Sequence, residues 1–287
     1  MGIGCAFAGG GLKGVSYIGV LKALEEIGVE IDYISGTSSG SIFAVMYSMG
    51  YGFDDIKDMF TSCYEKIIKI KKMPIVMDSA KFVFTKKFEL SGVIAGETLE
   101  ELVESYAKKR NFNSMNDIKK NMAIITVDAK STKECVLWTK EEMSDGNMDY
   151  ISDIPVGKAV RASMAFPAAF TPCKFRDYIF IDGGTKDNLP VSVLKKMGAE
   201  KTIGFSFALD EYKEDSNLFD TILRACDIFS YRDVLKAQGE SDLAIEIKIP
   251  SAKLLSIDSV DEAIKIGYDT VIENKDSILK LIEKTIV

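Results

Sequence analysis

The stretch Tyr33-Ile-Ser-Gly-Thr-Ser-Ser-Gly40 joins a short strand-like run to an apolar segment, residues 42–49, that predicts a largely buried helix. Within it, Gly36 and Gly40 flank Ser38 in a G-x-S-x-G pattern. A sharp turn from strand to helix pushes such a serine out at the carboxyl edge of a sheet, and side chains at the flanking positions would collide with the strand and the helix. The stretch therefore predicts a nucleophile elbow, although the pattern alone also fits a plain Gly/Ser turn.

A second junction of the same kind lies near the N-terminus. Residues 3–8 predict a buried strand that runs into Gly9-Gly-Gly-Leu-Lys-Gly14, and a helical stripe follows as far as Ile27. Consecutive glycines let main-chain N–H groups converge on an anion without a Cβ in the way. Ser39, the rival nucleophile, is not centred between its glycines, and we expect its N–H at a helix N-terminus to help hold an oxyanion.

The glycine run also supports an alternative function. It satisfies G-x-G-x-x-G, and Asp32 lies about where the ribose-binding acid of that motif would be. This combination predicts a dinucleotide-binding oxidoreductase. Against it, the second strand does not end at an acid but continues into the turn at Ser38.

A carboxylate follows a further apolar strand, Tyr178-Ile-Phe-Ile181, in the sequence Asp182-Gly183-Gly184. We expect Asp182 at the carboxyl edge of the sheet, the same edge as Ser38. An Asp-Gly turn is the plain interpretation of this dipeptide, but the chain contains no histidine. Every Ser-His-Asp and Cys-His mechanism is therefore excluded, and a nucleophile must be activated by a carboxylate, a lysine or another serine.

Composition narrows the possible partners. The formal net charge of -7 argues against nucleic acid. Five widely spaced cysteines without a CxxC pair predict reduced thiols in a cytoplasmic protein, with no zinc site. No run approaches the roughly 20 apolar residues that span a bilayer. We expect no cofactor and no metal.

The segments alternate between strands and helices, which predicts an α/β sandwich with a mainly parallel sheet. We find no internal repeat and no low-complexity linker, so we expect one domain over residues 1–287. The expected strands lie at 3–8, 33–35, 123–128, 135–138, 178–181, 202–207 and 243–249, and the expected helices at 15–27, 42–49, 54–72, 92–110, 156–165, 217–239 and 260–284.

Four segments in this order resemble the patatin-like phospholipase family: GGGLKG, GTSSG, Ala162-Ser-Met-Ala-Phe-Pro167, and DGG followed by Asp187-Asn-Leu-Pro190. The resemblance covers about residues 3–207, and residues 208–287 are expected as a C-terminal extension packed on that core. It implies a three-layer α/β/α fold and a serine hydrolase that cleaves fatty-acyl esters of phospholipids or lysophospholipids.

By matching position, the resemblance implies Ser38 as nucleophile, Asp182 as base, and an oxyanion loop between Gly9 and Gly14. Lys13 stands where the family has Arg or Lys. The resulting set of oxyanion residues is Gly9, Gly10, Gly11, Lys13, Gly14 and Ser39. We interpret Ser163 as a packing or hydrogen-bonding residue of a helix that Pro167 ends.

Residues 66–87 hold seven lysines against one acid, Asp78, with apolar residues between them. Such alternation is typical of a surface that contacts anionic lipid headgroups, and equally of a solvated helix and loop with one apolar side. This segment makes peripheral contact of a cytoplasmic protein with a membrane one possibility.

Overall fold

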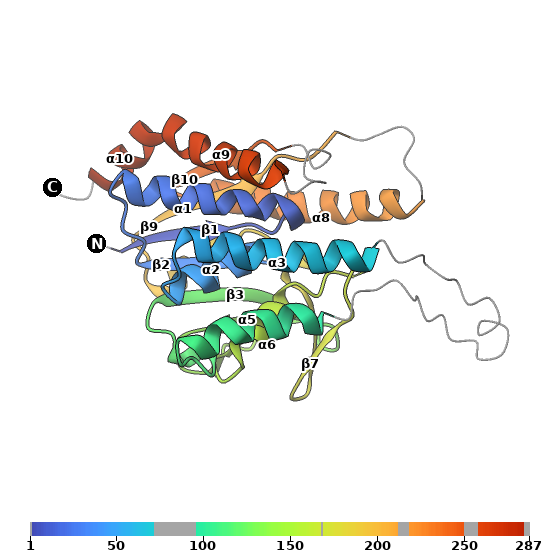
Figure 1. The fold of residues 1–287 in the computed structure, drawn as a ribbon. Coiled ribbons are helices and arrows are strands. Elements are labelled where there is room, and N and C mark those ends of the chain that lie inside the picture. The colour runs from blue at the N-terminus through green and yellow to red at the C-terminus, as the bar shows by residue number, and fades with distance from the viewer. Residues whose placement is uncertain (1, 72–95, 168, 212–217, 250–257, 284–287) are drawn as a thin grey trace, which may run out of the picture.

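The computed structural model describes residues 2–71, 96–167, 169–211, 218–249 and 258–283. Its strands form one sheet in the order β10-β9-β1-β2-β3-β4-β6-β5, with β8 beside β3 and β7 beside β8 (Figure 1). The strands are β1 Ile3–Phe7, β2 Tyr33–Thr37, β3 Asn121–Asp128, β4 Glu134–Trp138, β5 Met143–Ser144, β6 Met148–Ile151, β7 Cys173–Phe175, β8 Tyr178–Asp182, β9 Lys201–Phe207 and β10 Leu243–Ile247.

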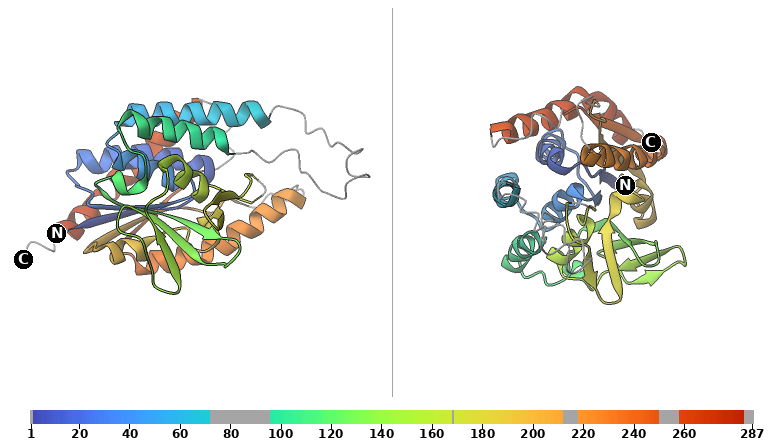
Figure 2. Two further views of the ribbon diagram at one scale, coloured as in Figure 1. Left: turned by 90° about the horizontal axis from the view of Figure 1, so that it is seen from below. Right: turned by 90° about the vertical axis from the view of Figure 1, so that its right-hand side faces the viewer.

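Helices cover both faces of this sheet (Figure 2). The α-helices are α1 Tyr17–Glu26, α2 Ser39–Ser48, α3 Phe53–Lys71, α5 Glu97–Lys109, α6 Val156–Ser163, α7 Val191–Met197, α8 Leu218–Glu240, α9 Asp258–Glu273 and α10 Lys275–Glu283. Short 3-10 helices are η1 Gly11–Ser16, η2 Met115–Asp117 and η3 Gly183–Thr185.

Successive side chains of a central strand enter different cores, as the two-residue period of a strand requires. On β1, Cys5 and Phe7 pack in the larger core with α1, α2, α6 and α9, whereas Ala6 packs in the smaller core with α7 and α8. Strands β10, β9, β1, β2 and β3 all run parallel. The predicted three-layer sandwich with a mainly parallel sheet is therefore confirmed.

Strand β8 lies on the same edge of β3 as β2, but it runs in the opposite direction. Strand β2 ends with Thr37 opposite Ile125, and β8 ends with Asp182 opposite Thr126, while β4 occupies the other edge of β3. The two strands therefore meet head-on along β3. Asp182 was expected at the carboxyl edge beside Ser38, and it lies there at the end of an antiparallel strand, a direction that the sequence pattern does not indicate. Strand β8 begins beyond the carboxyl end of β2, and its last residue, Asp182, lies level with the turn that holds Ser38.

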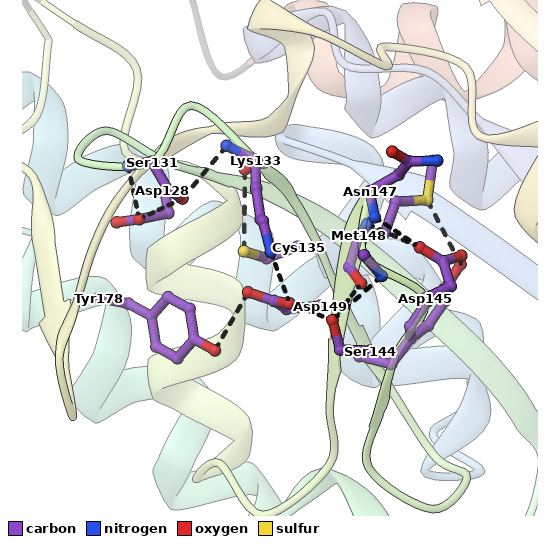
Figure 3. Close-up of polar contacts among 12 residues, drawn as sticks. Asp128, Ser131, Lys133, Cys135, Ser144, Asp145, Asn147, Met148, Asp149 and Tyr178 are labelled. Atoms are coloured by element: carbon purple, nitrogen blue, oxygen red, sulfur yellow. Dashed lines mark hydrogen bonds and ion pairs between the residues drawn. The ribbon is translucent and has the colours of Figure 1, made fainter.

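Polar side chains hold the outer end of β8. The Tyr178 hydroxyl donates to Asp149 of β6 at 3.3 Å, and Lys133 pairs with the same carboxylate at 3.5 Å (Figure 3). The N–H of Ile179 donates to Asp128 of β3 at 3.0 Å. These contacts fix the position of β8 before it reaches the centre of the molecule.

The C-terminal residues add to both the sheet and the helical layers. Strand β10 pairs with β9, and α9 packs against α1 and η1. A Cβ on Gly19 would lie 1.9 Å from the carbonyl oxygen of Ile264, and one on Gly267 would lie 2.0 Å from that of Ser16. Only glycine allows the backbones of these segments to approach so closely.

Some expectations differ from the structure or lie outside it. The first expected helix begins earlier, as the 3-10 helix η1, and α7 was not predicted. Of the basic segment 66–87, residues 66–71 form the end of α3, and residues 72–87 lie outside the described part. In the described ranges, no helix has both the length and the apolarity to cross a bilayer.

Candidate active site

The turn between β2 and α2 holds Ser38 in an unusual backbone conformation. Its φ of 52° and ψ of -124° lie where residues with a side chain are rarely found. A Cβ on Gly36 would lie 2.5 Å from the carbonyl oxygen of Gly40, and one on Gly40 would lie 2.3 Å from that of Phe7. Both glycines are therefore required for the turn, and the strain at Ser38 is maintained by the packing around it.

Hydrogen bonds hold both the main chain and the side chain of Ser38. Its N–H donates to the hydroxyl oxygen of Ser163 at 2.9 Å, and its carbonyl accepts from Ser41. Its own hydroxyl donates to Oδ2 of Asp182 at 2.6 Å. The structure thus brings together the two residues that the sequence analysis expected to meet.

Asp182 is 1% exposed, at the point where β8 meets β2. Its Oδ1 accepts from the N–H of Gly184 at 2.8 Å, and its own N–H donates to the carbonyl of Ala165 at 3.0 Å. Burial raises the pKa of Asp182 to about 6, although the hydrogen bonds from Ser38 and Gly184 favour the charged form. A Cβ on Gly183 would lie 2.4 Å from the carbonyl oxygen of Ile125, which explains the glycine next to the acid.

The glycine loop passes directly over Ser38, since a Cβ on Gly9 would lie 2.8 Å from the Cβ of Ser38. The N–H of Gly9 donates to Oδ1 of Asn188 at 3.0 Å, and the N–H of Gly10 donates to the hydroxyl oxygen of Ser39 at 3.1 Å. These two amides therefore brace the loop. A Cβ on Gly14 would meet Ser39 at 2.8 Å, so this glycine serves close packing.

The amides that remain for an anion are at the starts of two helices. The N–H of Lys13 donates to the carbonyl of Gly10, the first bond of η1. The amides of Gly11 and Leu12 precede that bond, and the amide of Ser39 begins α2, so none of the three has an acceptor within its own helix. They lie on the two segments that flank Ser38.

The side chain of Lys13 has a different place. It is 7% exposed, donates to the carbonyl of Ala208 at 3.1 Å and pairs with Asp210 at 3.1 Å. Arg224 of α8 also donates to the carbonyl of Asp210, at 2.8 Å. The ammonium group thus fixes the segment after β9 against the glycine loop.

Comparison with known proteins agrees with this geometry. The model of the patatin-like phospholipase family matches residues 5–195. The chain belongs to the patatin-like phospholipase family. The expected resemblance is confirmed.

Two relatives differ in how much of their own length this chain covers. The chain is 25% identical over 263 residues to Lysophospholipase NTE1 of Scheffersomyces stipitis, covering 92% of this chain but 15% of that protein. It is 26% identical over 210 residues to Uncharacterized protein YqhO of Bacillus subtilis, covering 70% of each. The chain therefore spans a small part of the NTE1 relative and most of YqhO.

Among solved structures, VipD from Legionella pneumophila aligns with a TM-score of 0.52 at 16% identity, over 96% of this chain and 67% of VipD. At this identity the likeness concerns the fold alone. It agrees with the patatin-like α/β architecture described above.

Beside Ser38, the patatin-like chain has a pocket of about 500 Å³. Ser38 and Asp182 lie in its wall, together with Gly9, Gly10, Gly11 and Asn188. The rest of the lining is largely apolar and includes Met164, Phe166, Phe170, Phe207, Leu209, Phe229 and Val234. Such a pocket suits a hydrocarbon chain next to a polar reacting group.

The structure argues against the dinucleotide alternative. The carboxylate of Asp32 accepts the N–H of Ile3 at 2.8 Å, at the amino end of β1. The glycine loop follows the carboxyl end of the same strand, on the opposite edge of the sheet. A ribose-binding acid must lie on the same edge as the glycine loop, so Asp32 is not placed for that role.

Two residues were not given a role at the site by sequence reasoning. Asn188 belongs to a quoted segment of the resemblance, and its amide clamps Gly9 by accepting from its N–H and donating to its carbonyl at 3.3 Å. Ser163 was interpreted as a hydrogen-bonding residue, but its partner, the N–H of Ser38, is 125 residues away in the chain. Only the tertiary structure reveals both partners.

Proposed function

We propose that this chain hydrolyses fatty-acyl esters of phospholipids or lysophospholipids through a dyad of Ser38 and Asp182. The observation that carries the proposal is the 2.6 Å hydrogen bond between Ser38 Oγ and Asp182 Oδ2, in a chain without histidine. Membership of the patatin-like phospholipase family and the relatives named lysophospholipase support the substrate class.

In the acylation step, Ser38 Oγ attacks the ester carbonyl while its proton passes to Oδ2 of Asp182. An ordinary aspartate, with a pKa of about 3.9, is a weak base for this transfer. The raised pKa of Asp182, about 6, makes the carboxylate a stronger base that is still ionised at neutral pH. The same proton then moves from Asp182 to the leaving alcohol, and the acyl group remains on Ser38.

The tetrahedral intermediate places a negative charge on the former carbonyl oxygen. We assign its stabilisation to the amides at the starts of η1 and α2, those of Gly11 and Ser39 foremost, aided by the positive end of the α2 dipole. The remaining members of the glycine loop and Lys13 support this arrangement by shaping and bracing the loop. Loss of one such donor typically slows an acyl transfer by about 100- to 1000-fold.

Deacylation repeats the sequence with water. Asp182, once more ionised, takes a proton from a water molecule that attacks the acyl carbonyl, and the collapsing intermediate returns Ser38 as the leaving group with that proton. The apolar pocket would hold the fatty-acyl chain through both steps. Its lining by Met164, Phe166 and Phe170 supports this use.

The decisive test combines active-site labelling with turnover. A fluorophosphonate probe should label the wild-type chain and fail to label Ser38→Ala. Asp182→Asn should retain the fold, as judged by circular dichroism, and lose turnover of a soluble short-chain ester. Labelling that persists in Ser38→Ala, or full turnover by Asp182→Asn, would exclude the dyad.

We also propose that residues 1–287 form one domain. The pairing of β10 with β9 and the glycine contacts between α9 and the N-terminal helices support it. Limited proteolysis that released the C-terminal part as a separately folded fragment would contradict it.

A further inference from the structure

The outer face of α8 carries most of the large apolar side chains that the described residues leave exposed. Ile228 is 53% exposed, Phe229 75% and Leu235 50%. Exposed residues of this kind elsewhere in the described part are Met143 on β5 and Ile272 on α9. Three such side chains on one helix form a patch, whereas the other two are isolated.

The same helix is also apolar on its inner face. Val234 is 3% exposed and Ala237 9%, and both pack in the core between α7, α8 and the sheet. A surface helix normally presents polar residues on the side away from the core. The apolar outer face of α8 therefore points to something outside the chain.

Helical spacing of three and four residues brings two cations into this patch. We define the α8 stripe as Ala225, Ile228, Phe229, Arg232, Leu235 and Lys236. The side chains of Arg232 and Lys236 are 88% and 77% exposed, and their ion pairs with Asp233 and Glu240 are long, at 3.9 and 3.8 Å. The stripe thus holds two exposed cations, and the acids Asp227, Asp233 and Glu240 border it on the same helix.

The stripe is continuous with the pocket. Phe229 lines the pocket wall although it is 75% exposed, so the pocket reaches the surface at the stripe. The N-terminal half of α8 projects beyond the carboxyl ends of the parallel strands (Figures 1 and 2). A protein bound to the stripe would cover this wall of the pocket, whereas a lipid surface would bury the apolar side chains and present acyl chains beside it.

We propose that the α8 stripe docks the protein on an anionic lipid surface. Ile228, Phe229 and Leu235 enter the boundary between headgroups and acyl chains, and Arg232 and Lys236 contact lipid phosphates. The proposal rests on the proposed function, because it takes lipid as the source of the substrate. It adds a surface outside the dyad, on a helix that the family model does not cover.

The apolar contribution is tested with Ile228→Gln/Leu235→Gln, a variant that changes no residue of the pocket. Binding is measured by co-sedimentation with vesicles of equal parts phosphatidylcholine and phosphatidylglycerol, in a Ser38→Ala background so that no lipid is consumed. Each side chain has about half of its surface left to bury. Full burial of such a side chain would strengthen partitioning onto the vesicle by a factor of about 10 to 100. The pair should therefore weaken partitioning by about 30-fold.

Matched controls separate docking from general effects. Met143→Gln/Ile272→Gln removes the two isolated apolar side chains and should leave partitioning unchanged. When Ser38 is retained, the variant Ile228→Gln/Leu235→Gln should hydrolyse a soluble short-chain ester at the wild-type rate. Each cation strengthens binding to an anionic surface by about a factor of five, so Arg232→Gln/Lys236→Gln should weaken binding to the mixed vesicles by about 25-fold. Binding of this variant to pure phosphatidylcholine should be unchanged.

Unchanged vesicle binding in Ile228→Gln/Leu235→Gln would overturn the proposal. A wild-type dimer in analytical ultracentrifugation that this variant converts to a monomer, with vesicle binding retained, would instead make the stripe a contact between copies of the chain. Failure of the proposed function is distinguishable, because it would abolish Ser38 labelling and leave the vesicle binding of the Ser38→Ala protein unaffected.

Discussion

Ser163 offers the sharpest test of how Ser38, the proposed nucleophile, is held in place. Its side chain is fully buried at the C-terminal end of α6, and its hydroxyl oxygen accepts the N–H of Ser38 at 2.9 Å. Since Ser38 has a φ of 52°, this bond helps to hold a conformation that the backbone would not adopt by itself. We expect removal of the hydroxyl to release Ser38 from its alignment with Asp182.

The perturbation is the pair Ser163→Val and Ser163→Thr. Valine and threonine have the same shape, so both variants bring the same extra bulk, and only threonine keeps the hydroxyl. Leaving a largely buried N–H without a partner costs about 1 to 2 kcal/mol. If this cost falls on the arrangement needed for attack, kcat of the valine variant should be about 5- to 30-fold lower than that of the threonine variant.

The assay is steady-state hydrolysis of a soluble short-chain ester, with the rate of fluorophosphonate labelling as a second measure of Ser38 reactivity. KM should be similar in the two variants, because Ser163 does not line the pocket. Equal kcat and equal labelling rates for valine and threonine would refute the reasoning, since the hydroxyl would then contribute packing alone.

Further predictions concern the other parts of the site. Asp182 must be ionised to accept a proton, so kcat/KM for the soluble ester should fall as the pH drops below its raised pKa of about 6, and a profile flat down to pH 4 would contradict this role. Gly40→Ala would bring a Cβ within 2.3 Å of the carbonyl oxygen of Phe7, and we expect thermal unfolding to show a loss of at least about 2 kcal/mol together with loss of labelling. Asn188→Leu removes the clamp on Gly9, and kcat should fall about tenfold or more with little change in Tm; an unchanged kcat would mean that the loop holds its shape without the clamp.

The local parts of the site were predictable because neighbouring residues determine them. The glycines around Ser38 are forced by backbone contacts within one turn and with the adjacent strand, and their spacing is visible in the sequence. The alternation of strands and helices likewise predicted the layers. The absence of histidine directed attention to Asp182 before any distance was known.

The remaining features depend on contacts between distant segments. A short apolar strand such as Tyr178–Asp182 has the same pattern whether it runs parallel or antiparallel, so its direction along β3 could not be predicted. The motif that included Asp32 failed for a similar reason. Spacing along the chain did not reveal that this carboxylate lies at the opposite edge from the glycine loop, bonded to Ile3.

The meeting of β2 and β8 along β3 has a consequence for which changes the chain can tolerate. Both strands pair with β3. The distance between Ser38 Oγ and Asp182 Oδ2 therefore depends on the register of each strand along β3. Extra residues in the connection between β7 and β8, where Arg176 and Asp177 are exposed, can loop out into solvent, but one residue inserted within β8 would turn Asp182 to the other face of the sheet. Length variation between natural relatives should therefore collect in that connection and be excluded from the five residues of β8.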